Sequence, residues 1–244
     1  MKTKTSGREA ELINALDSRG VIIFSPREVH RFLDTSYRNS YQILNRMHKK
    51  GLVRRIEKGK YILSERWEEL DVYEIASNIL NASYLGFISA LHFHHMTEQV
   101  PQKVFLASTK RKKPLTIQQR EVRFVNVQKD EFFGYEQYGE IVASNPEKTV
   151  VDCLKQLEYS GGLGNLYSSI DESLDIELMV NYCERLGISS VTSRLGYLLD
   201  KKGLLTDRDA QRLKNLIRHY SRLSPDRERK NPDKHWKLYV NREL

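Results

Sequence analysis

The period of the sequence changes at Gly51, and this change restricts the fold of the chain more than any other feature. Before Gly51, apolar residues recur at helical spacing and predict an amphipathic helix from about Ser36 to Lys50. After it, apolar and basic residues alternate around a tight turn at Glu57–Gly59, which predicts a two-stranded hairpin ending at Leu63. Because so short a hairpin is marginal alone, we expect it to pack on helices. The inward stripe of the helix would be Ile43, Leu44 and Met47.

A second helix is expected just before this one. Ser25 suits an N-cap and Pro26 a first helical position, so a helix is predicted from Pro26 to Asp34. The short apolar run from Val21 to Phe24 is expected to form a strand beside the hairpin. Helix, turn, helix and hairpin in this order indicate a winged helix-turn-helix, which docks its second helix in the major groove of double-stranded DNA.

The outward face of the second helix has the side chains that bind phosphates and base edges. We expect base-edge contacts from Arg38, Asn39, Gln42 and Asn45. We expect phosphate and positioning contacts from Ser36, Tyr37, Tyr41, Arg46 and Lys49. On the wing, the residues expected to contact the flanking backbone are Arg54, Arg55, Lys58 and Lys60.

The positive charge of the chain is concentrated in the same region. Residues 1–66 hold 15 Lys and Arg against 7 Asp and Glu, a net charge of +8, whereas the remaining 25 basic and 25 acidic residues cancel. A solvated basic surface need not coincide with a DNA-binding motif, so the coincidence favours binding to nucleic acid.

The rest of the chain predicts a second domain. The polar stretch from Ser64 to Asp71 suggests a boundary, with a winged-helix domain at 1–66 and a larger domain at 67–244. Strands are expected at 103–108, at 122–127 and within 132–144, in an antiparallel or mixed sheet. Helices are expected at 72–80 and 86–96, with a break at Ser83 and Tyr84, and then at 144–159, 175–187, 189–203 and 206–223. The fold class is therefore α+β, with a winged helix-turn-helix followed by a larger mixed α/β domain that has a helical end. We expect the apolar residues within Trp236–Val240 to dock the C-terminal tail onto this second domain.

Several segments resemble one family in order and nearly over the full length. They are VYEIASNILNASYLGFISALHFHH, QVPQKVFLAS, IVASNPEKTVVDCL, SRLGYLLD and WKLYVN, all after the predicted winged helix. Together they resemble AbiEi-type antitoxins, the transcriptional regulators of type IV toxin–antitoxin systems. The resemblance implies that the first domain binds operator repeats in its own promoter and represses the operon. It also implies that the second domain neutralises a nucleotidyltransferase-like toxin, without needing a stable complex, and it transfers no catalytic residue.

Other clusters of reactive side chains have simpler interpretations. His92, His94 and His95 lack the shared helical face and the further ligand that a metal site needs, so no metal is expected. The basic run from Lys110 to Lys113 fits a solvated loop better than a second phosphate contact, and the glycine-rich segment from Gly161 to Asn165 is expected to be a flexible connection.

Two alternatives to the regulator remain open. Carboxylates such as Glu140, Glu147 and Asp152 raise the possibility of a metal-dependent nuclease or nucleotide-modifying enzyme, but no catalytic signature accompanies them. The winged helix could instead be an adaptor that binds protein. We expect a protein that is not an enzyme and has no cofactor.

The sequence also bears on location. No apolar run approaches the ~20 residues that span a bilayer, and the N-terminus lacks an apolar signal region. Cys153 and Cys183 lie in apolar helical patterns and are expected to be reduced core thiols. These features predict a cytoplasmic protein without membrane contact.

Overall fold

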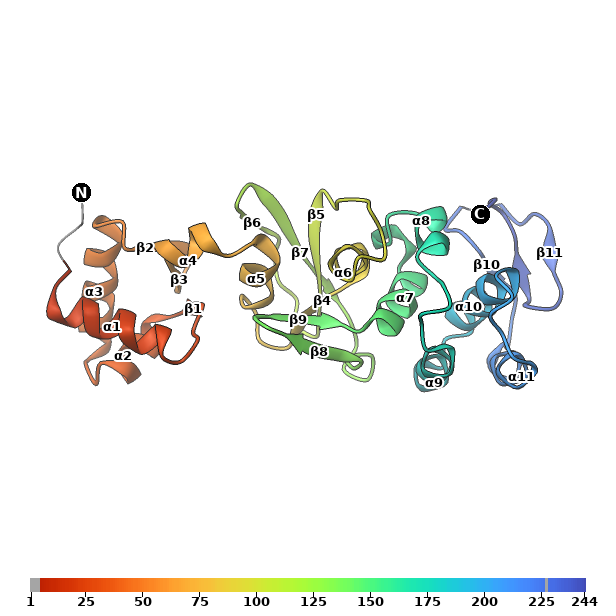
Figure 1. Ribbon diagram of the computed structural model, residues 1–244, viewed down its shortest axis with the longest axis horizontal. Coiled ribbons are helices and arrows are strands. Elements are labelled where there is room, and N and C mark those ends of the chain that lie inside the picture. The colour runs from red at the N-terminus through yellow and green to blue at the C-terminus, as the bar shows by residue number, and fades with distance from the viewer. Residues whose placement is uncertain (1–4, 227) are drawn as a thin grey trace. The chain divides into compact units, whose positions relative to one another are not determined.

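The structure is a computed structural model that describes residues 5–226 and 228–244. Over these residues it is a mixed α+β protein with eleven α-helices and three sheets, as the predicted fold class requires (Figure 1). The chain folds as two compact units. The first runs to Asn81 and includes Ile117–Gln119, and the second comprises Ala82–Thr116 and Arg120–Leu244.

The first unit contains five helices and a three-stranded antiparallel sheet, and the order of α1 to α3 and the sheet is consistent with a winged helix. Its elements are α1 (Gly7–Asp17), β1 (Ile23–Phe24), α2 (Pro26–Phe32), α3 (Tyr37–Lys49), β2 (Val53–Glu57), β3 (Lys60–Leu63), α4 (Ser64–Glu69) and α5 (Val72–Ser77). The sheet order is β1-β3-β2, so the strand expected before α2 does pair with the hairpin. Side chains of α1, α2, α3 and the sheet, among them Leu12, Val29, Leu44 and Met47, form its core.

The expected boundary after Arg66 falls inside this first unit. The polar segment that follows is not a linker but helix α4, which packs on β2 and β3. Gln118 also belongs to the unit, because its side-chain amide donates to the carbonyl oxygens of Trp67 (2.7 Å) and Leu70 (2.9 Å). Tertiary contacts therefore extend the unit beyond the point at which composition changes.

The second unit is built around a six-stranded mixed sheet of order β6-β7-β5-β4-β9-β8. Its strands are β4 (Ser83–Leu85), β5 (Lys103–Ser108), β6 (Leu115–Ile117), β7 (Arg120–Asn126), β8 (Tyr135–Tyr138) and β9 (Ile141–Ser144). β5 pairs in parallel with β7, and β4 with β9, whereas β4–β5 and β8–β9 are antiparallel. A mixed sheet was one of the two arrangements predicted.

Helices cover this sheet and continue into the C-terminal part (Figure 1). They are α6 (Phe87–Phe93), α7 (Pro146–Lys155), α8 (Leu163–Ser168), α9 (Ile176–Leu186), α10 (Ser189–Lys201) and α11 (Asp207–Leu216). α6 packs on β5 and on α7. α9 and α10 also pack on α7, and α11 packs on α9 and α10. Cys153 and Cys183 are free thiols buried in this core, as predicted.

Several predicted helices are shorter in the structure, such as the one expected at 144–159, which is α7 (Pro146–Lys155), and three further segments differ in kind or extent. Ser83 and Tyr84 do not lie in a break but in β4, a central strand too short to show a period. The segment from Gly161 to Asn165 is not a free connection, since α8 begins at Leu163 directly after two glycines of positive φ. The helix expected to reach residue 223 ends at Leu216.

The early end of α11 has tertiary causes. Beyond it, the N–H of Arg218 donates to Ser189 Oγ (3.1 Å), and Lys237 Nζ donates to the carbonyl oxygen of Ile217 (3.1 Å). The chain then forms β10 (Ser221–Arg222), which pairs in parallel with β12 (Leu238–Tyr239), and β11 (Pro232–Asp233) completes a small third sheet. Trp236, fully buried, docks the tail as the sequence predicted.

No helix among the described residues combines the length and apolar character that crossing a membrane requires.

Candidate nucleic-acid interface

The turn between α2 and α3 determines where the candidate recognition helix begins. Ser25 caps α2 because its Oγ accepts from the N–H of Arg27 (3.2 Å), and the Glu28 carboxylate accepts from the N–H of Ser25 (2.8 Å). At the other end, the His30 ring pairs with the carbonyl oxygen of Thr35. This contact fixes the turn that leads into α3.

Helix α3 has the boundaries that its capping residues predict. Ser36 Oγ accepts from the N–H of Asn39 (3.2 Å) at the start, and Gly51, with φ of +72°, follows the C-cap at the end. Ile43, Leu44 and Met47 are buried as expected, together with Ser40. The remaining face is solvent-exposed, and it holds all the candidate residues of the helix: Ser36, Tyr37, Arg38, Asn39, Tyr41, Gln42, Asn45, Arg46 and Lys49.

Two of these residues have specific neighbours that hold them in place. The Tyr37 ring stacks on the His30 ring of α2 with 4.4 Å between centroids, and Asn39 Nδ2 donates to Thr35 Oγ1 (3.3 Å). Tyr37 nevertheless stays 51% exposed, and Tyr41 stays 52% exposed. Large exposed aromatic rings with a polar end are typical of contact surfaces, because they can bury apolar area and still form hydrogen bonds.

The four basic residues of the wing differ in their solvent exposure and in their contacts within the protein. Arg54 lies 5.5 Å over the Trp67 ring and pairs with Glu68 of α4, while Arg55 Nε donates to the carbonyl oxygen of Glu57 (3.2 Å). Both remain exposed. Lys58 is also exposed at the hairpin turn, beside Gly59 with its φ of +78°.

Lys60 differs from the other three. Its ammonium group donates to the carbonyl oxygen of Ile79 and pairs with Glu57 at 3.3 Å. Both partners belong to the same unit, and the side chain is only 29% exposed. The structure therefore gives Lys60 an internal role that the sequence did not indicate.

A buried ion pair holds the end of α3 against α1. Lys50 Nζ lies 2.7 Å from Glu9 Oε2, and Glu9 is fully buried. Burial opposes ionisation of Glu9, but hydrogen bonds from Lys50 and Ser6 outweigh it, so the pKa of Glu9 lies below its ordinary value of 4.5. Glu9 is thus a carboxylate at neutral pH and neutralises one of the lysines close to α3.

Sequence reasoning missed two basic residues beside α3. Arg27 and Arg31, one turn apart on α2, line a hollow of about 460 Å³ together with His30, Tyr37 and the acidic residues Glu28 and Asp34. Their i, i+4 spacing places them on one face of the helix, and this spacing is the feature of the sequence from which they could have been predicted. They place two exposed positive charges on α2 near the start of α3, with Glu28 and Asp34 beside them.

The other clusters singled out from the sequence have structural partners. His94 Nε2 pairs with the carbonyl oxygen of Ser144 (2.6 Å), and Asp152 pairs with the buried Lys148. Among the described residues, no group of three or more His, Cys, Asp or Glu side chains is arranged so that it could hold a metal ion. The basic run from Lys110 to Lys113 lies in the loop between β5 and β6, as expected.

Comparison of the sequence with protein-family models and with curated proteins found no match. Among solved structures, the chain is similar to the crystal structure of the RV2827C protein from Mycobacterium tuberculosis. The two chains share 13% identity and superpose with a TM-score of 0.58, over 97% of this chain and 92% of the other. This likeness extends over nearly the full length and shows a shared fold.

Proposed function

We propose that the protein is a DNA-binding transcriptional regulator that inserts α3 into the major groove of operator DNA. One observation supports this most: a single exposed face of α3 holds every candidate contact residue, opposite a buried apolar stripe. The major groove accommodates an α-helix, and Arg, Asn and Gln side chains pair there with base edges. In this proposal Arg38, Asn39, Gln42 and Asn45 read bases.

Electrostatics supports the same face. Phosphate contacts from basic side chains supply most of the affinity for DNA. The basic side chains available for this are on three elements. They are Arg46 and Lys49 of α3, Arg27 and Arg31 of α2, and Lys58 of the wing. Exposed tyrosines at positions 37 and 41 add hydrogen bonds that fix the register.

We further propose the role that the family resemblance implies. The protein would repress its own operon and act as the antitoxin of an AbiEi/AbiEii-like system, neutralising a nucleotidyltransferase-like toxin with or without direct contact. It would do so in the cytoplasm and without being an enzyme itself. The supporting features are the ordered segments named above, from VYEIASNIL at the end of the first unit to WKLYVN in the second.

The first experiment is a gel-shift titration of the protein with the DNA upstream of its own gene, at two salt concentrations. An unrelated fragment of equal length is the control. We expect tight binding that prefers the upstream fragment and weakens steeply with salt, because each phosphate contact releases a counterion. Equally weak binding to both fragments contradicts the regulator and favours an adaptor, and Mg²⁺-dependent turnover of DNA or RNA favours an enzyme.

Two variants separate base reading from backbone contact. Arg38→Ala is expected to cost roughly 1–3 kcal/mol and to reduce the preference for the upstream fragment. Lys58→Ala is expected to weaken binding to both fragments about equally. Lys110→Ala, in the loop after β5, is a matched control that removes a positive charge outside the interface. Identical behaviour of the Arg38 and Lys58 variants would show that the reading face is assigned wrongly.

A further inference from the structure

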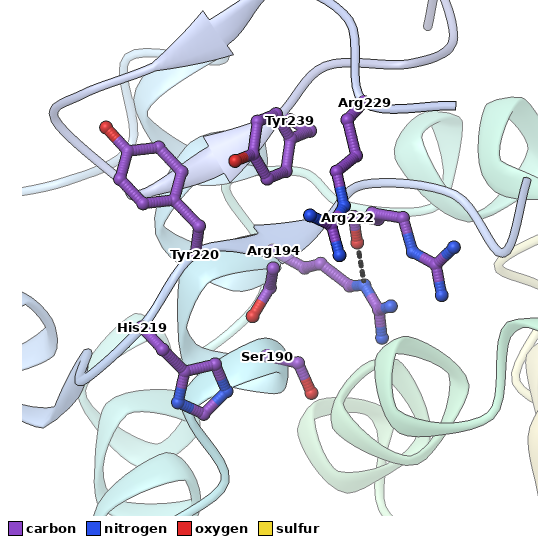
Figure 2. A pocket seen from close by; sticks show the side chains of 8 residues that line it. Ser190, Arg194, His219, Tyr220, Arg222, Arg229 and Tyr239 are labelled. Carbon is purple, nitrogen blue, oxygen red and sulfur yellow. Dashed lines mark hydrogen bonds between the residues drawn. The ribbon is translucent and has the colours of Figure 1, made fainter. Parts of the chain in front are cut away.

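The second unit contains a basic pocket that the proposed function does not use. Its volume is about 430 Å³, and its walls come from α10, from β10 and the residues just before it, from Arg229 after β10, and from β12. Ligand pockets are typically ~300–1,000 Å³, so this one has room for a small molecule. In Figure 2, His219 and Tyr220 lie on the left and the guanidinium groups of Arg194 and Arg222 lie on the right.

Arg194 is fixed at the base of the pocket. Its Nε donates to the carbonyl oxygen of Arg222 (2.9 Å), and its Nη1 donates to that of Leu154 (2.7 Å). Among the described residues, Nη2 has no hydrogen-bond partner. Two bonds to the backbone thus hold a planar cation in one orientation, which lowers the entropy lost when an anion binds.

Two more arginines face the same space. The side chains of Arg222 and Arg229 are exposed, and neither forms an ion pair with a described residue. Burial and the positive charge of Arg222 lower the pKa of Arg194 to about 10, whereas Glu158 opposes this shift. Arg194 stays charged at neutral pH, in surroundings where an anion would stabilise it.

Two further features of the pocket wall are an unpaired buried hydroxyl and an exposed aromatic ring. Ser221, which is 8% exposed, has a buried Oγ without a hydrogen-bond partner among the described residues. An unpaired buried hydroxyl is costly unless something else satisfies it. Tyr220 is 41% exposed, and its ring lies 5.3 Å from the Tyr239 ring, so one wall is aromatic.

We propose that this pocket binds a free nucleotide, with its phosphate groups on Arg194, Arg222 and Arg229 and its base against Tyr220. An arginine guanidinium group can donate two parallel hydrogen bonds to two phosphate oxygens, so three arginines lining one hollow suit a phosphate-bearing ligand. Aromatic side chains stack on bases of any kind, so the geometry identifies the class of ligand rather than a particular base.

The test is isothermal titration calorimetry of the full-length protein with ATP, GTP, CTP and UTP in turn. Adenosine and inorganic phosphate are the two fragments that separate base from phosphate binding. At least one nucleoside triphosphate should bind to a single site, at least tenfold more tightly than inorganic phosphate. Adenosine alone should bind more weakly than ATP, because it lacks the groups that the arginines contact.

Two variants and one control locate the site. Arg222→Gln combined with Arg229→Gln should weaken nucleotide binding about tenfold or more, since charge-assisted hydrogen bonds are among the strongest polar contacts. Lys110→Gln combined with Arg111→Gln removes the same charge from another exposed loop and should leave binding unchanged. Tyr220→Leu should bring the affinities for nucleotide and inorganic phosphate closer together. Thermal unfolding of each variant shows that it is folded.

Three outcomes overturn the proposal. The first is the absence of heat for all four nucleotides at millimolar concentration. The second is equal affinity for nucleotides and inorganic phosphate, which would mean that no base is recognised. The third is that the Arg222 and Arg229 variant loses affinity for upstream DNA but not for nucleotides, which would make the cluster a DNA contact. Because the proposed operator face lies on α3, failure of the pocket test leaves the gel-shift result unaffected.

Discussion

The Trp236 ring occupies the space in which a side chain at Gly196 would stand. A Cβ built on Gly196 would lie 2.1 Å from Cζ3 of that ring, far inside van der Waals contact. The indole Nε1 also donates to Asp200 Oδ2 (2.9 Å), one turn further along α10. Because Gly196 has no side chain, the tail can dock on α10. The docked tail places β12 beside β10 at the arginine pocket.

Gly196→Ala is accordingly expected to destabilise the protein. Alanine favours a helix by about 1 kcal/mol over glycine, but overpacking against a rigid, fully buried ring costs roughly 1–3 kcal/mol or more. We expect a net loss in the free energy of unfolding, measured by urea denaturation. The control is Gly164→Ala in α8, where nothing lies within 4 Å of the added Cβ and the stability should hold or rise. Equal effects at both positions would contradict the role assigned to Gly196.

Glu9→Gln tests the ion pair that ties α1 to the end of α3. The folded pKa of Glu9 is lowered, so its contribution is fully present above the ordinary value of 4.5 and is lost as pH falls through the folded pKa. The variant should be less stable than the wild type by about 1 kcal/mol at pH 7, and the difference should shrink toward pH 3. Urea denaturation at both pH values measures it.

The matched control for this ion pair lies on the same helix. Glu11 pairs with Arg8 at 3.1 Å, but both side chains are more than half exposed. Because exposed pairs contribute little, Glu11→Gln should change the free energy of unfolding by less than about 0.5 kcal/mol. A pH-independent loss for Glu9→Gln would mean that packing, and not the charge, accounts for the effect.

The sequence predicted the local features of the first unit well. Ser25, Ser36 and Gly51 are strong start and stop signals, and the buried positions 43, 44 and 47 follow one helical stripe. These signals act between residues a few positions apart, so they can be recognised without the fold. For the same reason the exposed face of α3 could be listed residue by residue.

Features made by distant residues could not be predicted in this way. The bond from Lys60 to Ile79 joins positions 19 apart, and composition gives no sign of it. The arginine pocket depends on α11 ending at Leu216, where Ser189 and Lys237 capture the chain. Helical periodicity runs on past that point, so the sequence predicted a longer helix and placed His219 and Tyr220 on it.

The two lysines of the wing should behave differently in DNA binding. Lys58→Ala removes an exposed charge, so the slope of log affinity against log salt should fall by about 1. Lys60→Ala removes a cation that is already bonded to Ile79 and Glu57, and it should leave that slope nearly unchanged while lowering stability. Salt titrations of both variants with upstream DNA measure the difference. A loss of slope in the Lys60 variant would show that this lysine turns outward to contact phosphate.

Removing Lys148 should be the most damaging single change considered. It is fully buried in α7, where its ammonium group pairs with Asp152 and donates to Tyr84 Oη (3.3 Å), and Tyr84 in turn donates to Asp152 (2.8 Å). Lys148→Met leaves the carboxylate buried without its counter-charge, which typically costs 3–5 kcal/mol.

A second substitution separates the lost charge pairing from lost packing. Lys148→Met combined with Asp152→Leu removes both charges and should cost clearly less than the sum of the two single changes. Urea denaturation of the two single variants and the double variant gives the coupling energy. Additive losses would indicate that the two side chains stabilise α7 through separate contacts.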